Sequence, residues 1–176
     1  MAELPFVRRN GQLHLMKTMC TLLVLALGCV VGDAAQIERE TFSMTLPEGW
    51  TEDTKDDLYD ANSFVMFENS ESCLFTVIVG KNSAGATVED LVKNQREEWQ
   101  KRVTEAKSAD ITVWSKYEGK GFELEGKVQG VFRSRARIFG FQKGDNVCVV
   151  IEFGALADLK KFASDFEKIR QTFKLK

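Results

Sequence analysis

The sequence predicts a single α+β domain in which an antiparallel β-sheet is flanked by helices. Three observations support this fold class. Seven short segments have the composition or alternation of strands, tight turns join several of them, and only two segments have helical periodicity. Strands joined by short turns pair antiparallel, and helices inserted at two points give an α+β sandwich.

The predicted strands alternate or are rich in β-branched and aromatic residues. In the first, Phe42, Met44 and Leu46 share one face. Asn69–Glu71 predicts a hairpin loop, and Gly144 supplies the positive φ of a second hairpin turn. The expected strands are residues 41–46, 63–67, 72–79, 111–114, 121–128, 131–141 and 146–153.

Two helices are predicted, over residues 87–103 and 157–173, because apolar residues recur there at helical spacing. Thr87 suits the N-cap of the first helix. Each helix has one apolar stripe, so we expect each to lie against a face of the sheet. The stripes consist of Val88, Leu91, Val92, Trp99 and Val103, and of Leu159, Phe162, Ala163, Phe166, Ile169 and Phe173.

Residues 1–35 are predicted to be a signal peptide and leader, and residues 36–176 the folded domain. Lys17 precedes an apolar run, residues 19–32, and small residues follow it. The run is shorter than the roughly 20 residues of a membrane span. A secreted or periplasmic location is therefore expected. Translation could start at Met1 or Met16, and lipidation at Cys29 is an alternative to free secretion.

Composition argues against several function classes. The net charge of −2 gives no broad attraction to nucleic acid. The only histidine, His14, lies in the predicted leader, so cleavage would remove any histidine-based triad or metal site. The acidic run 52–60 lacks the spacing and the glycine of a calcium loop, which favours a solvated loop. We expect no cofactor, no metal and no enzymatic activity.

Cys73 and Cys148 are the cysteines outside the leader. They lie in separate predicted strands, without CxxC spacing. A disulfide suits a secreted protein, but two buried free thiols fit the strand pattern equally well. Both alternatives stay open.

Arg133, Arg135 and Arg137 form the most pointed pattern, because side chains in a strand alternate and all three therefore share a face. They could bind an anion or an acidic partner. A cross-strand ladder is the favoured alternative. With a turn centred near Gln129, Glu125 would face Arg133, Glu123 would face Arg135, and Arg137 would be left over.

Trp50 follows Pro47 and Gly49, which end a strand and permit a turn. A tryptophan there can bury a large surface over the sheet edge. Packing is therefore the favoured role for Trp50. Binding is the alternative, in which Trp50 joins Arg133, Arg135 and Arg137 as candidate binding residues.

The stretches FSMTLPEGWTEDT (residues 42–54) and DFEKIRQTFK (residues 165–174), with the order of elements between them, resemble the PsbP-like superfamily. This superfamily includes PsbP, DcrB-type bacterial lipoproteins and a Ran-binding nuclear import factor. The resemblance implies an α/β/α sandwich around an antiparallel sheet. It also implies a non-catalytic binding, adaptor or assembly role.

These observations together predict a secreted or periplasmic binding, adaptor or assembly protein. Its expected partner is another protein of the cell envelope, reached through a surface groove of the sheet. Membrane association is expected only with lipidation at Cys29. The alternatives are a small-ligand carrier and a hydrolase that uses carboxylates alone.

Overall fold

The structure is a computed structural model that describes residues 34–71, 73–85 and 87–176. The predicted leader, with His14, Met16 and Cys29, lies outside the described residues apart from Ala34 and Ala35. The first described strand begins at Ala35, one residue before the predicted domain.

The described residues form ten strands and three α-helices, with a short 3₁₀ helix at Asn82–Ala84. The strands are β1 (Ala35–Glu38), β2 (Phe42–Leu46), β3 (Trp50–Glu52), β4 (Phe64–Asn69), β5 (Leu74–Lys81), β6 (Val103–Trp114), β7 (Tyr117–Val128), β8 (Phe132–Lys143), β9 (Asn146–Ala155) and β10 (Lys174–Leu175). The helices are α1 (Val88–Arg102), α2 (Leu156–Lys161) and α3 (Ala163–Thr172).

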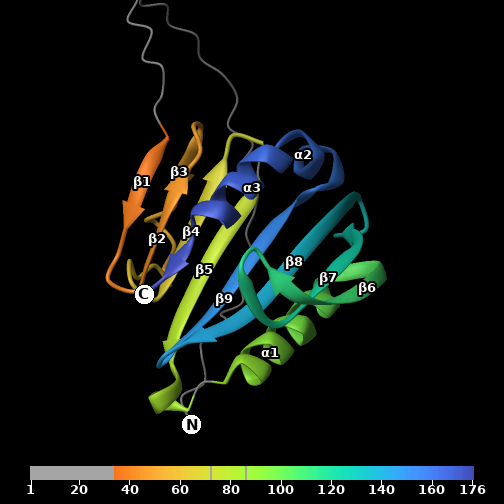
Figure 1. Cartoon of the computed structure of the whole chain (residues 1–176). Coiled ribbons are helices and arrows are strands. Elements are labelled where there is room, and N and C mark those ends of the chain that lie inside the picture. Colours follow the sequence, from red (N-terminus) through yellow and green to blue (C-terminus); the bar gives the residue numbers. More distant parts are fainter. Residues whose placement is uncertain (1–33, 72, 86) are drawn as a thin grey trace, which may run out of the picture. The chain divides into compact units, whose positions relative to one another are not determined.

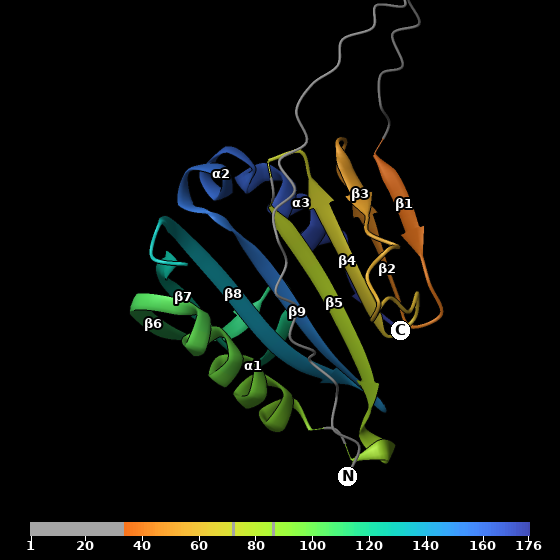
Figure 2. The ribbon, with the colours of Figure 1, turned by 180° about the vertical axis from the view of Figure 1, so that it is seen from behind.

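All strand pairs are antiparallel. Seven strands form one sheet in the order β3-β4-β5-β9-β8-β7-β6, and a small sheet has the order β1-β2-β10. Figures 1 and 2, seen from opposite sides, show α1 on one face of the large sheet and α3 with the small sheet on the other. We call these the α1 face and the α3 face. The α+β prediction is confirmed.

The core on the α3 face is largely aromatic. Trp114 of β6 stacks on Phe75 and Phe141, and Phe173 after α3 meets the Trp114 ring edge-on at 5.5 Å between centroids. Phe42 of β2 also stacks on Phe173. Elements distant in sequence are therefore held together by ring contacts in one buried cluster.

The core on the α1 face is mainly aliphatic, and α1 lies very close to the sheet at Gly140. A Cβ added to Gly140 would lie 2.6 Å from Val92 Cγ2 and 3.0 Å from Val88 Cγ1. Thr87 caps α1, since its hydroxyl accepts from the Asp90 N–H at 3.1 Å, as predicted.

One predicted helix is two helices. The segment 157–173 is divided at Phe162, whose φ of −99° and ψ of 22° depart from helical values. The break lets Leu159 of α2 and Phe166 of α3 both point into the core on the α3 face.

Strand β6 begins eight residues before the predicted strand 111–114. Its residues from Thr104 to Asp110 are all exposed, so they lack the apolar alternation that marks a strand. The short strands β1, β3 and β10 were not predicted.

Candidate binding surface

The candidate surface lies at the end of the β7–β8 hairpin, and its three arginines are on the α3 face. Arg133, Arg135 and Arg137 have the same parity along β8 as the core residues Phe139 and Phe141, and therefore share their face. We call these three residues the arginine row. The shared face is as predicted.

The predicted register of the ladder is wrong by two residues. Glu123 faces Arg137, Glu125 faces Arg135, and Lys127 faces Arg133. The turn centres on Gly130 instead of Gln129, with φ of 72° and 53° at these residues. Paired residues of a hairpin lie equally far from the turn centre, so moving the centre by one residue changes the partner of each arginine by two residues.

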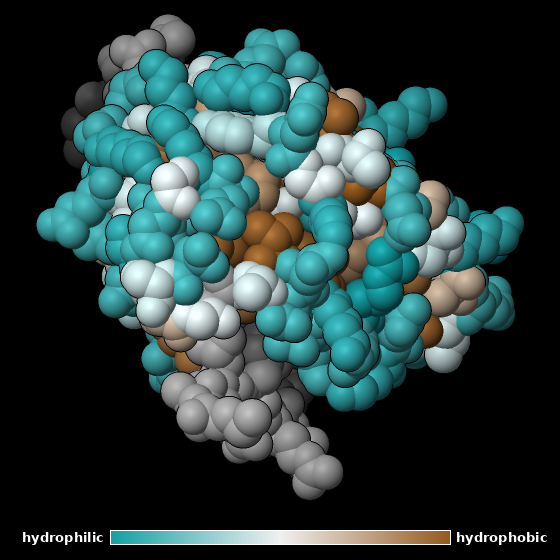
Figure 3. Space-filling model, turned by 60° about the horizontal axis from the view of Figure 1, so that its bottom comes forward, coloured by the Kyte–Doolittle hydropathy of each residue, from teal (hydrophilic) through white to brown (hydrophobic). Residues whose placement is uncertain are grey.

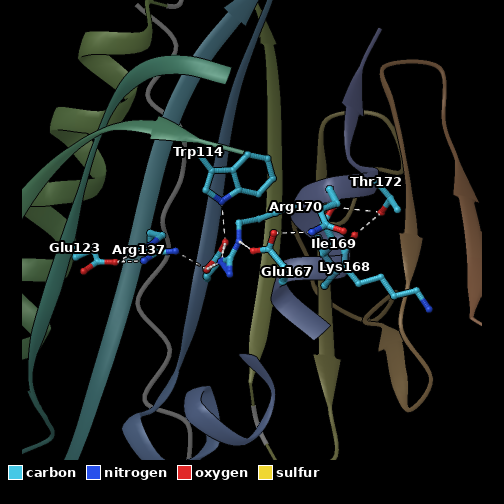
Figure 4. Close-up of polar contacts among 10 residues, drawn as sticks. Trp114, Glu123, Arg137, Glu167, Lys168, Ile169, Arg170 and Thr172 are labelled. Carbon is cyan, nitrogen blue, oxygen red and sulfur yellow. Dashed lines mark hydrogen bonds and ion pairs between the residues drawn. The ribbon is translucent and has the colours of Figure 1, made fainter. Parts of the chain in front are cut away.

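Arg137 is the most firmly held member of the row, which contradicts its predicted place as the unpaired arginine. Its Nε donates to Glu123 Oε1 at 2.6 Å, and its Nη1 lies 3.7 Å from Glu152 Oε2. Glu152, on β9, is buried at 6% exposure. Arg137 is therefore held from both neighbouring strands (Figure 4).

Glu152 is the centre of a polar cluster that reaches from β6 to α3. Arg170 donates to both of its carboxylate oxygens, at 2.9 and 2.8 Å, and Trp114 Nε1 donates to Oε1 at 2.7 Å (Figure 4). A buried charge is tolerated only with such partners. We call Trp114, Glu123, Arg137, Glu152 and Arg170 the Glu152 cluster. Its charges are satisfied internally.

The other two arginines are more available. The Arg133 side chain is 63% exposed, and its nearest carboxylate, on Glu125, is 3.9 Å away. Arg135 is half-buried and has no ion pair among the described residues. A guanidinium that is exposed or has no ion pair can still donate hydrogen bonds to a carboxylate of a partner protein.

Two large apolar side chains are exposed beside Arg133. Val131 is 69% exposed and Phe132 is 63% exposed, at the end of the hairpin. Alternation along β8 predicts a buried Phe132, because Phe132 has the parity of the buried Ala136 and Ile138. Its closeness to the turn at Gly130 is the one signal that could have indicated exposure. We call Val131, Phe132 and Arg133 the hairpin tip.

Trp50 does not join this surface. It lies on β3, four strands from β8, which is about 19 Å at the usual strand spacing. Its ring is buried, meets Phe166 edge-on at 5.2 Å, and donates from Nε1 to Asp165 Oδ2 at 2.9 Å. These contacts attach β3 to α3.

Cys73 and Cys148 are both buried free thiols, so the disulfide alternative is wrong. Cys73 Sγ lies against Gly154 of β9. Gly154 and Cys148 are six residues apart on this strand, which is about 20 Å. A disulfide needs Cα atoms within about 7 Å. Burial raises the pKa of the Cys73 thiol to about 11 and raises the pKa of Cys148 further. Both are therefore poor nucleophiles at neutral pH.

The acidic run 52–60 is occupied with local contacts. The side chains of Asp53, Asp56 and Asp60 accept hydrogen bonds from backbone N–H groups two residues later, and Glu52 pairs with Arg39 at 2.7 Å. Within the described residues, no group of three or more histidine, cysteine or acidic side chains could hold a metal ion.

A separate hollow of about 340 Å³ lies on the α1 face. It is lined from α1 by Glu89, Val92, Lys93 and Arg96, from β6 by Asp110, Ile111 and Thr112, and from β7 by Lys120 and Gly121. Seen from the lower side of Figure 1, the surface is mostly hydrophilic, with apolar side chains visible in small areas (Figure 3). No helix in the described part of the chain combines the length and hydropathy that crossing a membrane requires.

No protein-family model matches the chain, and no curated protein matches it. Among solved structures, a point mutant of the protein Mog1 is similar with a TM-score of 0.52 and 10% identity, over 81% of this chain and 96% of that one. The cyanobacterial PsbP of Synechocystis sp. PCC 6803 aligns with a TM-score of 0.47 and 14% identity, over 86% and 99%.

A protein from Bacteroides thetaiotaomicron aligns with a TM-score of 0.48 and 13% identity over 77% of this chain. The aligned part spans only 45% of that protein's length. At these identities the likeness concerns the fold alone. The likeness to Mog1 supports the PsbP-like fold that the sequence resemblance indicated.

Proposed function

We propose that this protein is a secreted or periplasmic binding or assembly protein without catalytic activity, and that the hairpin tip contacts a partner protein of the cell envelope. The observation that carries the proposal is the exposure of Val131 and Phe132 directly beside Arg133.

Aromatic residues and arginine are enriched where proteins bind one another. Burying Phe132 in a partner's pocket would contribute about 1.5–3 kcal/mol. Arg133 and Arg135 would add carboxylate recognition, whereas Arg137 is already bound to Glu123 and lies near Glu152. The expected partner surface is therefore an apolar pocket with a carboxylate beside it.

The proposed location rests on the leader pattern before residue 36. A basic flank, an apolar run and small residues are typical of a secretory signal peptide. Mass spectrometry of the protein from its own cells would test the proposal, because cleavage would place the mature N-terminus near residue 35 or 36.

The partner proposal is tested by affinity purification from a cell-envelope extract of the native organism. We expect one protein to be recovered in stoichiometric amount with the wild-type chain. Phe132→Ser should reduce the recovered affinity by about 30-fold, the size of a hot-spot residue. The matched control is Leu58→Ser, which changes an exposed leucine of the loop before β4.

Equal recovery by Phe132→Ser and Leu58→Ser would contradict the proposed surface. Arg133→Ala and Arg135→Ala should each weaken binding less than Phe132→Ser and lower its dependence on salt. An unchanged salt dependence in both arginine variants would contradict carboxylate recognition.

The hollow between α1 and β6 favours a second candidate, a small-ligand carrier, because its volume lies in the lower range of ligand sites. Native mass spectrometry of protein purified from its own cells tests this candidate. A retained mass that is lost in Thr112→Trp, which adds a large ring at the exposed β6 wall of the hollow, would support it. A bare polypeptide mass would argue against it.

A further inference from the structure

The two edges of the large sheet differ in length and exposure. At one edge, β3 has three residues, and Trp50 attaches it to α3. At the other edge, β6 has twelve residues, and those from Thr104 to Asp110 are all exposed. β6 pairs only with β7, so its outer edge has no backbone partner among the described residues. Such an edge can accept a further strand.

Irregularities confine the usable part of this edge. The β6–β7 register shifts between Thr104 and Lys107 and again between Ile111 and Val113, and Glu105 has a φ of 53°. Between the shifts, residues 107–111 pair regularly with β7. We call residues 107–111 the edge window. Bulges beside an edge discourage uncontrolled pairing, which leaves the edge window as the part suited to a partner strand.

The hollow on the α1 face adjoins this window. Asp110 and Ile111 belong to both, and α1 forms the opposite wall. A strand added along β6 would point every second side chain toward the α1 face. Those side chains would reach the hollow, which gives the added strand a side-chain site as well as backbone hydrogen bonds.

The charge of the hollow indicates what those side chains would be. Lys120 is paired with Glu89, and Arg96 donates to Asp110 at 2.5 Å. Lys93, exposed on the same wall, has no ion pair within the described residues. The lining thus has three cations and two carboxylates, so an acidic side chain would complement it.

We propose that the edge window binds an extended segment of a partner protein as an added strand, with an acidic side chain beside Lys93. A second copy of this chain is a poorer occupant. Its own edge window contains Lys107 as well as Asp110, so it offers no net negative charge to Lys93. This inference goes beyond the proposed function, because it uses none of the residues of the hairpin tip.

The test uses capped synthetic heptapeptides and the protein without its leader. The first peptide alternates valine and glutamate, the second has lysine in place of glutamate, and the third has proline at its centre. Amide hydrogen exchange is measured with each peptide up to about 1 mM, the range of weak strand addition.

We expect the glutamate peptide to slow exchange in residues 107–111. The lysine peptide should bind at least about tenfold more weakly, because it meets Lys93, Arg96 and Lys120. The proline peptide should give no protection, because it cannot complete the backbone ladder. Lys93→Glu should weaken binding of the glutamate peptide about tenfold, and the matched control Lys160→Glu, on α2, should not.

Phe132→Ser should leave peptide binding unchanged. Failure of the edge-window inference can therefore be distinguished from failure of the proposed function. Unchanged exchange in residues 107–111 with every peptide would overturn the inference. Protection of residues 131–133 in place of the window would also overturn it. So would a concentration-dependent dimer, seen by sedimentation, that protects the window without peptide.

Discussion

The two ends of β8 differ although they belong to one strand and present the same parity to the α3 face. At one end, Phe139 and Phe141 are buried, and Phe141 contacts the rings of Trp114 and Phe173. At the other end, Arg133 is exposed. Arg137 lies between them, within the Glu152 cluster. Parity therefore determines the face of a side chain, and the covering elements determine whether it is core or surface.

Removing the carboxylate of Glu152, which lies between the two ends of β8 in this comparison, should have the largest effect on stability. Glu152→Ala should lower the free energy of unfolding by about 3–5 kcal/mol, because it leaves Arg170 and the Trp114 N–H without their buried acceptor. Urea unfolding measures the change. Glu125→Ala, at the exposed end, is the control and should change stability by less than about 0.5 kcal/mol.

Replacing both members of the pair sharpens this prediction. Glu152→Leu combined with Arg170→Met should recover most of the loss, since apolar residues can replace a buried ion pair. A loss below about 1 kcal/mol for Glu152→Ala would show that the cluster contributes little to stability.

The buried end of β8 should resist added volume. Gly140→Ala should cost about 1–3 kcal/mol, because its new Cβ would meet Val92 and Val88 of α1. Thermal unfolding of this variant, of Val92→Ala and of the double variant gives the coupling between the two sites. The double variant should be more stable than the sum of the single changes predicts, and strict additivity would contradict the close approach.

Within the arginine row, Arg137 should contribute more to stability than Arg135. Arg137→Ala should destabilise by about 1 kcal/mol, because Glu123 and Glu152 lose a partner. Arg135→Ala, which removes no ion pair seen in the described residues, should stay within about 0.5 kcal/mol. Chemical denaturation of both variants compares them, and equal losses would contradict the difference between the two positions.

The effect that is smallest at neutral pH concerns Cys73, which lies beneath α2 at the covered side of the sheet. The folded state holds the thiol proton more tightly, since burial raises the Cys73 pKa to about 11, against about 8.5 when unfolded. The free energy of unfolding should therefore fall as pH rises from about 8.5 through 11. Denaturation across this range should show a smaller fall for Cys73→Ala, and identical profiles would contradict the prediction.

Most of the fold could be predicted from the sequence because its inner strands and helices have strong periodicity. The exceptions have physical causes. Residues 104–110 are exposed on both sides of an edge strand and so carry no apolar alternation. The strands β3 and β10 are too short to show a period. The residues around Phe162 keep helical spacing although the helix breaks there.

Less of the candidate surface could be predicted. The shared face of Arg133, Arg135 and Arg137 follows from alternation alone. Their partners depend on the centre of the turn, and a difference of one residue in that centre changes every pair. The exposure of Phe132 depends on how far neighbouring elements extend, which no local pattern records. The separation of Trp50 from the row required the strand order.

The small sheet sets a condition on when the protein can finish folding during its synthesis. β2 pairs with β10, and the Thr45 N–H donates to Thr172 Oγ1, 127 positions later. Phe42 likewise stacks on Phe173. β2 can pair early with β1, but a ribosome must release nearly the whole domain before β2 can pair with β10. A chain emerging from the ribosome would remain incompletely folded until then. An export machinery that transports unfolded polypeptides requires a chain in this state.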